Sequence, residues 1–257
     1  MGPKRASFQD FALRTGKMTM NPNMEVNIKD QPYHGKQVVP DPLHQKGHTC
    51  FLHSTSTSTE SQYKSRGALQ DPQEDFEVIL SRQDFKDQYE KKHGPIGGEK
   101  EEHTGFTRLT NSLEILKREG VPGYKGKQRA GLFKIMSYHE KDPVHVSKPS
   151  RSNPKSKRNP PQDIQKILCL AHVMVGTFRL SKNYKSLKPG DIYVYDKDDP
   201  ETINGKYCSH AVAIIGYGRR EGVWYYVFQN SYGEGWGEKG VGRVAMDSLR
   251  HLVRIKI

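Results

Sequence analysis

The sequence contains little of what builds a disulfide-stapled or membrane-spanning protein. Three cysteines are too few for a disulfide framework, and a hydrophobic content of 33% is low. No apolar run approaches the length of a transmembrane helix, and the first residues show no signal peptide. Pro3 and Ala6 also argue against a myristoylation site. We therefore expect a soluble protein of a reducing compartment, cytoplasmic by sequence; the alternative is a gene model that has lost its secretory leader.

Charge is the other unusual property of the chain. Lysine and arginine total 41 against 29 acidic residues, which gives a formal net charge of +12. A basic surface can indicate an acidic partner or nucleic acid, but no nucleic-acid-binding motif accompanies it. We interpret the excess as solvated loops, and a nuclear-import role for residues 155–158 is the weaker alternative. The length of 257 residues suits one domain or one two-lobed unit, and we expect a monomer.

Two segments near the C-terminus carry most of the information. Residues 209–218 form a β-branched run that opens with His210 and ends in glycines, which is typical of a buried strand. Residues 223–228 predict a second strand, and Asn230 follows it directly. A hairpin of these strands brings His210 and Asn230 together at one end of a sheet. An imidazole oriented by a side-chain amide is the base of a site with a cysteine nucleophile.

These residues resemble the C-terminal half of the papain-like cysteine peptidases. That family has His-Ala-Val-x-x-x-Gly-Tyr-Gly, then Asn-Ser-Trp-Gly-x-x-Trp-Gly-x-x-Gly, and residues 209–243 match this pattern with Tyr232 in place of one tryptophan. The resemblance implies an α+β fold of two lobes. A helical left lobe would hold the nucleophile helix, an antiparallel β-barrel-like lobe would lie on the right, and the active-site cleft would lie between them. We expect a divergent member without the signal peptide, long propeptide and disulfide framework of the family.

The resemblance also suggests how the chain is divided. We expect a disordered polar segment over residues 1–30 and a peptidase domain over residues 31–257. Within that domain the left lobe would span about 40–140 and the right lobe about 162–257. A basic, proline-rich linker at 141–161 would join them. Further elements are predicted as a strand at 78–80 and a helix capped by Ser81, helices at 111–120 and 164–170, and extended segments at 173–178 and 190–195.

The region around the cysteine is the poorest match. Gln45, Gly47 and Cys50 follow the family order of oxyanion glutamine, glycine turn and nucleophile, but the motif Cys-Gly-Ser-Cys-Trp is absent. The gap from Gln45 to Cys50 is one residue short of the usual pattern. Residues 54–59 alternate serine and threonine, which lowers helix propensity and leaves hydroxyl groups to satisfy. We expect this helix to be less stable than its apolar counterpart.

The resemblance implies a role for each site residue. Cys50 would be the nucleophile, His210 its proton acceptor and donor, and Asn230 the group that orients the imidazole. Gln45 and the backbone N–H of Cys50 would stabilise the oxyanion. Substrate would contact Gly97, Gly98 and Ser209, and Tyr232 and Trp236 would shield the histidine–asparagine pair from water. His210 and Asn230 lie farther along the chain than the family's spacing of about 130–150 residues, and we attribute the difference to the basic linker.

The sequence therefore favours a cysteine-type endopeptidase that forms a thioester acyl-enzyme on polypeptide substrates and needs no cofactor. The altered surroundings of Cys50 leave a second interpretation open, a catalytically inactive homologue that binds peptides or proteins. A third rests on His44, His48, Cys50 and His53, which offer metal-binding groups within ten residues. Their spacing fits no standard zinc motif, so we predict no metal site there.

Overall fold

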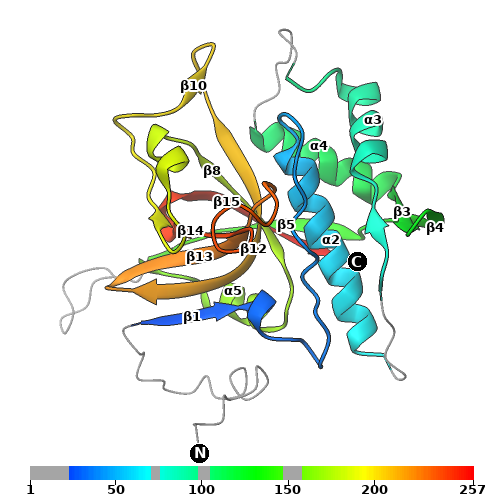
Figure 1. Ribbon diagram of the computed structural model, residues 1–257, viewed down its shortest axis with the longest axis horizontal. Coiled ribbons are helices and arrows are strands. Elements are labelled where there is room, and N and C mark those ends of the chain that lie inside the picture. Colours follow the sequence, from blue (N-terminus) through cyan, green and yellow to red (C-terminus); the bar gives the residue numbers. More distant parts are fainter. Residues whose placement is uncertain (1–22, 71–75, 98–104, 147–157) are drawn as a thin grey trace, which may run out of the picture.

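A computed structural model describes residues 23–70, 76–97, 105–146 and 158–257 of the chain. Helices gather on one side of the molecule and a large mixed sheet on the other, as Figure 1 shows. This is the α+β, two-lobed arrangement that the sequence predicts. Among the described residues, no helix combines the length and apolar character needed to span a bilayer.

The right lobe is built on an eight-stranded sheet in which β12 is central. Its strands pair antiparallel, except that β14 and β9 run parallel. The order along the sheet is β5 (Ser137–Lys141), β15 (Leu249–Lys256), β8 (Met174–Arg179), β12 (Ser209–Arg220), β13 (Val223–Gln229), β14 (Val241–Ala245) and β9 (Ile192–Tyr193), with β1 (Met24–Asn27) also on β12.

The β12–β13 hairpin forms as its sequence predicts. Glu221 and Gly222 both have positive φ, 51° and 85°, the backbone of a two-residue hairpin turn that follows the strands' twist. Most of β12 is buried because both of its faces are covered. Val212 and Ile214 belong to the right-lobe core, whereas Ala211 belongs to the core cluster shared with the helical lobe. The hairpin is thus fixed from two sides at the end that carries His210.

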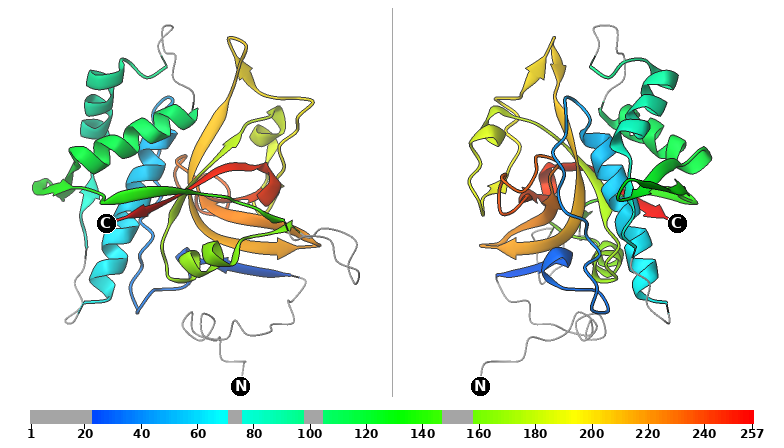
Figure 2. Two further views of the ribbon diagram at one scale, coloured as in Figure 1. Left: turned by 180° about the vertical axis from the view of Figure 1, so that it is seen from behind. Right: turned by 45° about the vertical axis from the view of Figure 1, so that its right-hand side comes forward.

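The left lobe packs three helices and a small sheet around a second apolar cluster. Ser81 caps α3 as expected, since its hydroxyl accepts a hydrogen bond from the backbone N–H of Asp84 at 3.1 Å. The elements are α2 (Cys50–Ala68), α3 (Arg82–His93), α4 (Gly105–Arg118), β2 (Ile79–Leu80), β3 (Val121–Lys125) and β4 (Gln128–Phe133). The views in Figure 2 show α2 running along the sheet, and α4 also contacts β12.

Short elements complete the described chain. Residues 164–170 and 173–178 were expected as a helix and an extended segment, and they contribute to α5 and β8 respectively. The remaining elements are α5 (Gln162–Cys169), the pairs β6 (His145–Val146) with β7 (Arg158–Asn159) and β10 (Thr202–Ile203) with β11 (Lys206–Tyr207), and the 3-10 helices η1 (Ile28–Asp30), η2 (Lys182–Ser186) and η3 (Met246–Ser248).

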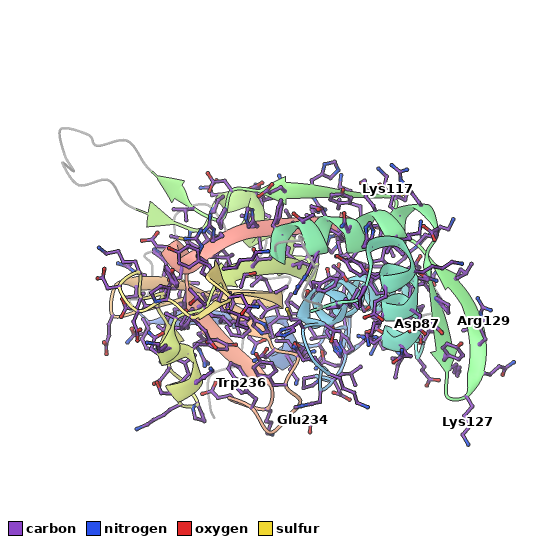
Figure 3. The ribbon with its side chains drawn as sticks, turned by 90° about the horizontal axis from the view of Figure 1, so that it is seen from above. Asp87, Lys117, Lys127, Arg129, Glu234 and Trp236 are labelled. Carbon is purple, nitrogen blue, oxygen red and sulfur yellow. The ribbon has the colours of Figure 1, made fainter. Side chains whose placement is uncertain are left out.

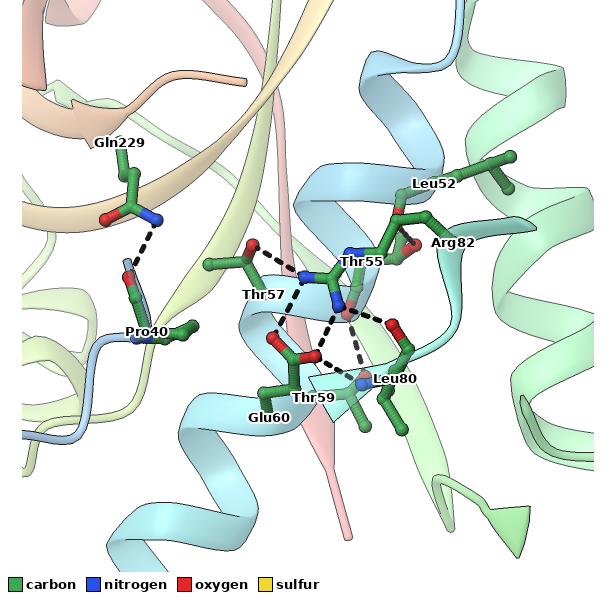
Figure 4. Close-up of polar contacts among 9 residues, drawn as sticks. All are labelled: Pro40, Leu52, Thr55, Thr57, Thr59, Glu60, Leu80, Arg82 and Gln229. Atoms are coloured by element: carbon green, nitrogen blue, oxygen red, sulfur yellow. Dashed lines mark hydrogen bonds and ion pairs between the residues drawn. The ribbon is translucent and has the colours of Figure 1, made fainter. Parts of the chain in front are cut away.

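The serine- and threonine-rich part of α2 is buried, and most of its hydroxyl groups have partners. Thr55 donates to the carbonyl of Phe51 at 2.8 Å within the helix. Ser58 donates to the carbonyl of Val173 at 2.7 Å and Ser65 to that of Ala171 at 3.1 Å, both outside the helix. Figure 4 shows the bonds of Thr55 to the carbonyl of Leu52 and of Thr59 to that of Thr55, and the pairing of Glu60 with Arg82. The polar residues of α2 therefore bind it to the segment that leads into β8.

One boundary differs from the sequence prediction. The disordered segment was expected to reach residue 30, but residues 24–30 form β1 and η1 because β1 pairs with β12 and Ile28 is fully buried. The left lobe was predicted to end at about 140, and β5 pairs with β15 of the right lobe from Ser137 onward. Much of the predicted basic linker, residues 147–157, lies outside the described residues.

Candidate active site

Cys50 is the first residue of α2, directly after the turn in which Gly47 has a φ of 63°. Its thiol makes hydrogen bonds with the His210 side chain and with the backbone of Ala211, both on β12. Burial, the largest single influence, raises the pKa of this thiol. The hydrogen bond and charge of His210, together with smaller contributions from Ala211 and Arg108, outweigh burial, so the net pKa lies below its ordinary value. The site therefore favours the thiolate, which is the nucleophilic form.

Asn230 fixes the orientation of the His210 ring. Nε2 of His210 lies 2.7 Å from Oδ1 of Asn230, and both side chains are almost completely buried. The amide oxygen is an acceptor only, so Nε2 carries the proton and Nδ1 is left to face Cys50. The Oδ1 atom also accepts from the backbone N–H of Ser231 at 2.9 Å. The ring is therefore held in the tautomer that lets it exchange a proton with the thiol.

Aromatic rings enclose this pair. The ring of Tyr232 lies 5.3 Å from that of His210, and Phe178 and Tyr184 each lie 5.8 Å from it. Trp236 packs 6.0 Å from both Tyr184 and Tyr232. The sequence predicted that Tyr232 and Trp236 would shield the histidine–asparagine pair. Tyr232 lies beside the imidazole, and Trp236 packs against Tyr232 and Tyr184 in the enclosing layer.

Tyr184 is the member of this layer that the sequence did not reveal. Its hydroxyl accepts a hydrogen bond from Nδ2 of Asn230 at 3.2 Å, and the side chain is buried. It lies in η2, a short turn in a polar segment with no hydrophobic periodicity. This turn and Asn230 are far apart in the sequence, so their contact depends on tertiary packing and no local pattern could have predicted it.

Gln45 lies on the loop before α2 and is tied to the right lobe. Its backbone N–H donates to the carbonyl of Ser231 at 2.7 Å, and its side-chain oxygen accepts from the hydroxyl of Ser231. Its amide nitrogen donates to the carbonyl of Gly47 at 2.6 Å. A primary amide has two N–H groups, so one N–H of Gln45 remains besides the bond to Gly47; its predicted oxyanion role stays a prediction.

The three residues predicted to contact the substrate do not share one environment. Gly97 has a φ of 78° and lies against His48, so a side chain there would be both strained and crowded. Gly98 lies outside the described residues. Ser209 opens β12 next to His210, and its hydroxyl abuts Gly105 of α4, where a methyl group would overlap it. Ser209 of the right lobe is therefore in direct contact with the start of α4 in the left lobe.

His53 lies one turn beyond Cys50 and is buried. It lines a small pocket together with Thr57, Gln229 and Asn230. Burial lowers its pKa to about 3, and the positive charges of Arg82 and His44 act in the same direction. His53 is thus neutral over the physiological pH range. Across the described ranges, the structure contains no group of three or more histidine, cysteine or acidic side chains arranged to hold a metal.

The other two cysteines are free thiols with a different environment. Burial raises the pKa of Cys169, whose sulfur lies 3.8 Å from the hydroxyl of Tyr217. Burial also raises the pKa of Cys208, and the negative charge of Glu201 adds to this effect. Among the three thiols, the lowered pKa belongs to Cys50.

A helix-borne thiol facing an imidazole on a sheet, with an amide behind it, is a papain-like arrangement. The family model described as papain family cysteine protease matches residues 29–255. The chain belongs to this family.

Individual relatives are distant and several match only in part. Mouse cathepsin K is 25% identical over 246 residues, which cover 95% of this chain and 66% of that protein. A viral cathepsin of Lymantria dispar multicapsid nuclear polyhedrosis virus is 32% identical over 94 residues, covering 34% of this chain and 26% of the relative. The chain thus spans less than two thirds of the length of these curated relatives.

Solved structures agree on the fold. Procathepsin L2 from the larval midgut of Tenebrio molitor has a TM-score of 0.58 and 16% identity, covering 98% of this chain and 73% of that one. Xylellain, a cysteine protease from Xylella fastidiosa, has a TM-score of 0.56 and 17% identity, covering 90% and 85%.

Proposed function

We propose that the protein is a cysteine peptidase that cleaves polypeptides internally through a thioester acyl-enzyme. The observation that carries this proposal is the hydrogen-bonded series from Cys50 through His210 to Asn230. The cathepsins among its relatives support the same reaction class.

In the first half of the reaction, the Cys50 thiolate attacks the carbonyl carbon of the scissile bond. The resulting oxyanion receives hydrogen bonds from the remaining N–H of Gln45 and from the backbone N–H of Cys50. His210, protonated at both nitrogens, donates its Nδ1 proton to the leaving amine. The C–N bond breaks, and the amino-terminal part of the substrate stays on Cys50 as a thioester.

In the second half, His210 is the general base. Its neutral Nδ1 takes a proton from a water molecule, whose oxygen attacks the thioester carbonyl. Collapse of the tetrahedral intermediate breaks the C–S bond, releases the acid and restores the thiolate–imidazolium pair. Asn230 keeps the ring in place throughout, since Nε2 remains bonded to the same oxygen.

Labelling with an epoxide-type probe directed at papain-like thiols tests the proposal. We expect Cys50 to be labelled, with a pH midpoint below the ordinary thiol value of 9.0 because His210 stabilises the thiolate. In His210→Ala, burial still raises the pKa of the Cys50 thiol, but the opposing effect of His210 is lost. The pH midpoint of labelling should therefore rise, and the labelling rate at neutral pH should fall about 10²–10⁴-fold.

Cys208→Ala is the matched control, because it removes a second partly exposed thiol and should leave labelling unchanged. Cys50→Ala should abolish labelling. A folded protein that stays unlabelled, or that labels equally well without His210, would overturn the proposal and indicate a non-catalytic member of the family.

A further inference from the structure

The loop before α2 is tied to the right lobe at two neighbouring residues. The backbone N–H of Gln45 donates to the carbonyl of Ser231 at 2.7 Å. Directly before it, His44 forms an antiparallel bridge with Tyr232, and Nδ1 of His44 lies 3.0 Å from the carbonyl oxygen of Tyr232. The backbone of Gln45 is therefore fixed beside Ser231, whereas the direction of its side chain depends on further contacts.

Two hydrogen bonds fix the side-chain amide of Gln45 at opposite ends. Its oxygen accepts from the hydroxyl of Ser231, and its nitrogen donates to the carbonyl of Gly47 at 2.6 Å. The reverse orientation would place the amide oxygen against the carbonyl of Gly47, where neither atom has a hydrogen to donate. Because the amide group is planar, these two bonds also set the direction of its second N–H.

Ser231 also contacts the amide that orients the imidazole. Its backbone N–H donates to Oδ1 of Asn230 at 2.9 Å, and the same oxygen accepts from Nε2 of His210. The Ser231 side chain lies at this junction of the two lobes and is buried. One residue thus contacts both the side chain that holds His210 and the side chain predicted to bind the oxyanion. Only the contact with the Gln45 side chain uses the hydroxyl group.

We propose that Ser231 is a positioning residue whose hydroxyl group holds the second N–H of Gln45 in the direction of the oxyanion. This inference rests on the proposed peptidase function and on the oxyanion role predicted for Gln45. A donor that is already directed at the developing charge stabilises the transition state without the cost of reorientation. When one end of the amide is released, the Gln45 side chain samples further orientations, and its N–H is directed at the oxyanion for less of the time.

Steady-state kinetics on a neutral peptide test the inference in the full-length protein. Ser231→Ala removes the hydroxyl group and keeps both backbone contacts of this residue. We expect kcat to fall about five- to tenfold with little change in KM, the effect of one hydrogen bond that matters only in the transition state. Ser231→Thr keeps a hydroxyl group and should retain most of the parent kcat.

A double-mutant cycle identifies the route by which Ser231 acts. Gln45→Ala should lower kcat about 10²–10³-fold, the usual loss of an oxyanion donor. In the Gln45→Ala protein, Ser231→Ala should then change kcat by less than about twofold, because the hydroxyl group has no amide left to hold. The matched control is Ser112→Ala, which removes a buried hydroxyl group bonded to the carbonyl of Leu109 at 2.7 Å and should leave kcat unchanged.

The pH midpoint of probe labelling distinguishes this role of Ser231 from an effect on the nucleophile. His210 keeps its hydrogen bonds with Cys50 and Asn230 in Ser231→Ala, since neither bond involves the substituted hydroxyl group. The midpoint should therefore stay at the parent value while kcat falls. A shifted midpoint would show that Ser231 acts on the thiol–imidazole pair and would overturn the inference.

The kinetic outcomes separate this inference from the function on which it rests. An unchanged kcat in Ser231→Ala or in Gln45→Ala, a change in KM alone, or an equal loss with and without Gln45 would each overturn the inference and leave the peptidase intact. Absence of peptide cleavage by the parent protein would overturn the proposed function, and this inference with it.

Discussion

At the residue scale, Asn230 is held from three directions. Its side-chain oxygen binds His210 and the backbone of Ser231, its nitrogen binds the hydroxyl of Tyr184, and its backbone N–H donates to the carbonyl of Gly240 at 2.8 Å. The orientation of the His210 ring depends on how firmly the side-chain amide of Asn230 is itself held. In the proposed peptidase, Tyr184 would therefore be a positioning residue that acts on catalysis through Asn230 and His210.

We expect Tyr184→Phe to lower kcat about fivefold with little change in KM. The substitution removes one neutral hydrogen bond, worth about 1 kcal/mol, and keeps the ring that covers His210. Steady-state kinetics on a neutral peptide measure the effect. The control is Tyr124→Phe, which removes a hydroxyl bonded to Asp84 in the left lobe. A change in KM alone would contradict a positioning role.

His53 predicts how stability depends on pH. Its pKa is about 3 in the folded protein and about 6.5 when unfolded, so between these values the unfolded chain binds the extra proton. Its contribution therefore destabilises the fold progressively as pH falls from about 6.5, by at most about 1.4 kcal/mol per pH unit. In His53→Phe this loss should be smaller.

Denaturant unfolding at several pH values between about 7 and 4 measures the difference. The matched control is His139→Phe, because His139 is an exposed histidine on β5. If the unfolding free energies of His53→Phe and the parent protein change in parallel over this range, the buried neutral histidine does not govern acid stability.

At the scale of the element, α2 carries polar side chains where a buried helix usually carries apolar ones. Its hydroxyl groups bind backbone carbonyls of its own turns and of residues 171 and 173. Within the described part of the chain, the hydroxyls of Ser56 and Ser61 are buried with no protein partner. The sequence suggested a helix weakened by its serines and threonines, and the structure shows that most of them also attach it to the rest of the fold.

Glu60 is the most buried charge of α2. It pairs with Arg82 and accepts a hydrogen bond from the backbone N–H of Leu80 at 2.6 Å, joining α2 to β2 and α3 (Figure 4). We expect Glu60→Leu to cost about 3–5 kcal/mol of unfolding free energy, because Arg82 is then left buried without its partner. Urea unfolding measures this loss.

Two further variants identify its cause. Asp199→Asn breaks an exposed ion pair with Lys182 and should change the unfolding free energy very little. Glu60→Leu combined with Arg82→Leu should recover part of the stability, since no unpaired charge remains. Equal losses of unfolding free energy for Glu60→Leu and the double variant would show that the unpaired charge of Arg82 is not the cause of the destabilisation.

At the scale of the whole molecule, the described chain begins and ends in the same sheet. Glu25 of β1 accepts hydrogen bonds from Arg243 of β14, at 2.6 Å from Nε and 2.9 Å from Nη2, and from Tyr225 of β13 at 2.8 Å. Burial raises the pKa of Glu25, but these hydrogen bonds and the charge of Arg243 outweigh it, so the net pKa is lowered. The contacts join residues two hundred or more positions apart in the sequence.

Glu25→Gln should lower the unfolding free energy by about 1.5–3 kcal/mol near neutral pH, the value of hydrogen bonds to a charged group. Because the folded-state pKa of Glu25 is lowered, its contribution is present above the unfolded value near 4.5 and is lost as pH falls through the folded value. The difference between variant and parent should therefore shrink in acid. Urea unfolding at neutral and acidic pH tests both statements.

Glu234→Gln serves as the control for this prediction. Glu234 is an exposed acid in the glycine-rich turn, as Figure 3 shows, so its neutralisation should have little effect on stability. A loss in Glu25→Gln that is the same at neutral and acidic pH would show that charge does not hold β1 in place.

Local patterns in the sequence determined the parts of the protein that depend on neighbouring residues. The strand of residues 209–218, its partner at 223–228 and the Ser81-capped helix all formed, because side-chain periodicity, turn residues and caps act over a few positions. The order of Gln45, Cys50, His210 and Asn230 also indicated the family to which the chain belongs.

Only the tertiary structure decided which distant side chains meet. The contact of Tyr184 with Asn230, that of Gly105 with Ser209, and the pairing of β1 with the central strand of the sheet have no local signature. Each depends on how segments far apart in the chain are packed together, and burial then fixes their charges and hydrogen bonds. The sequence thus determined the types and the order of the proposed catalytic residues, whereas packing decided which side chains support them and their electrostatic environment.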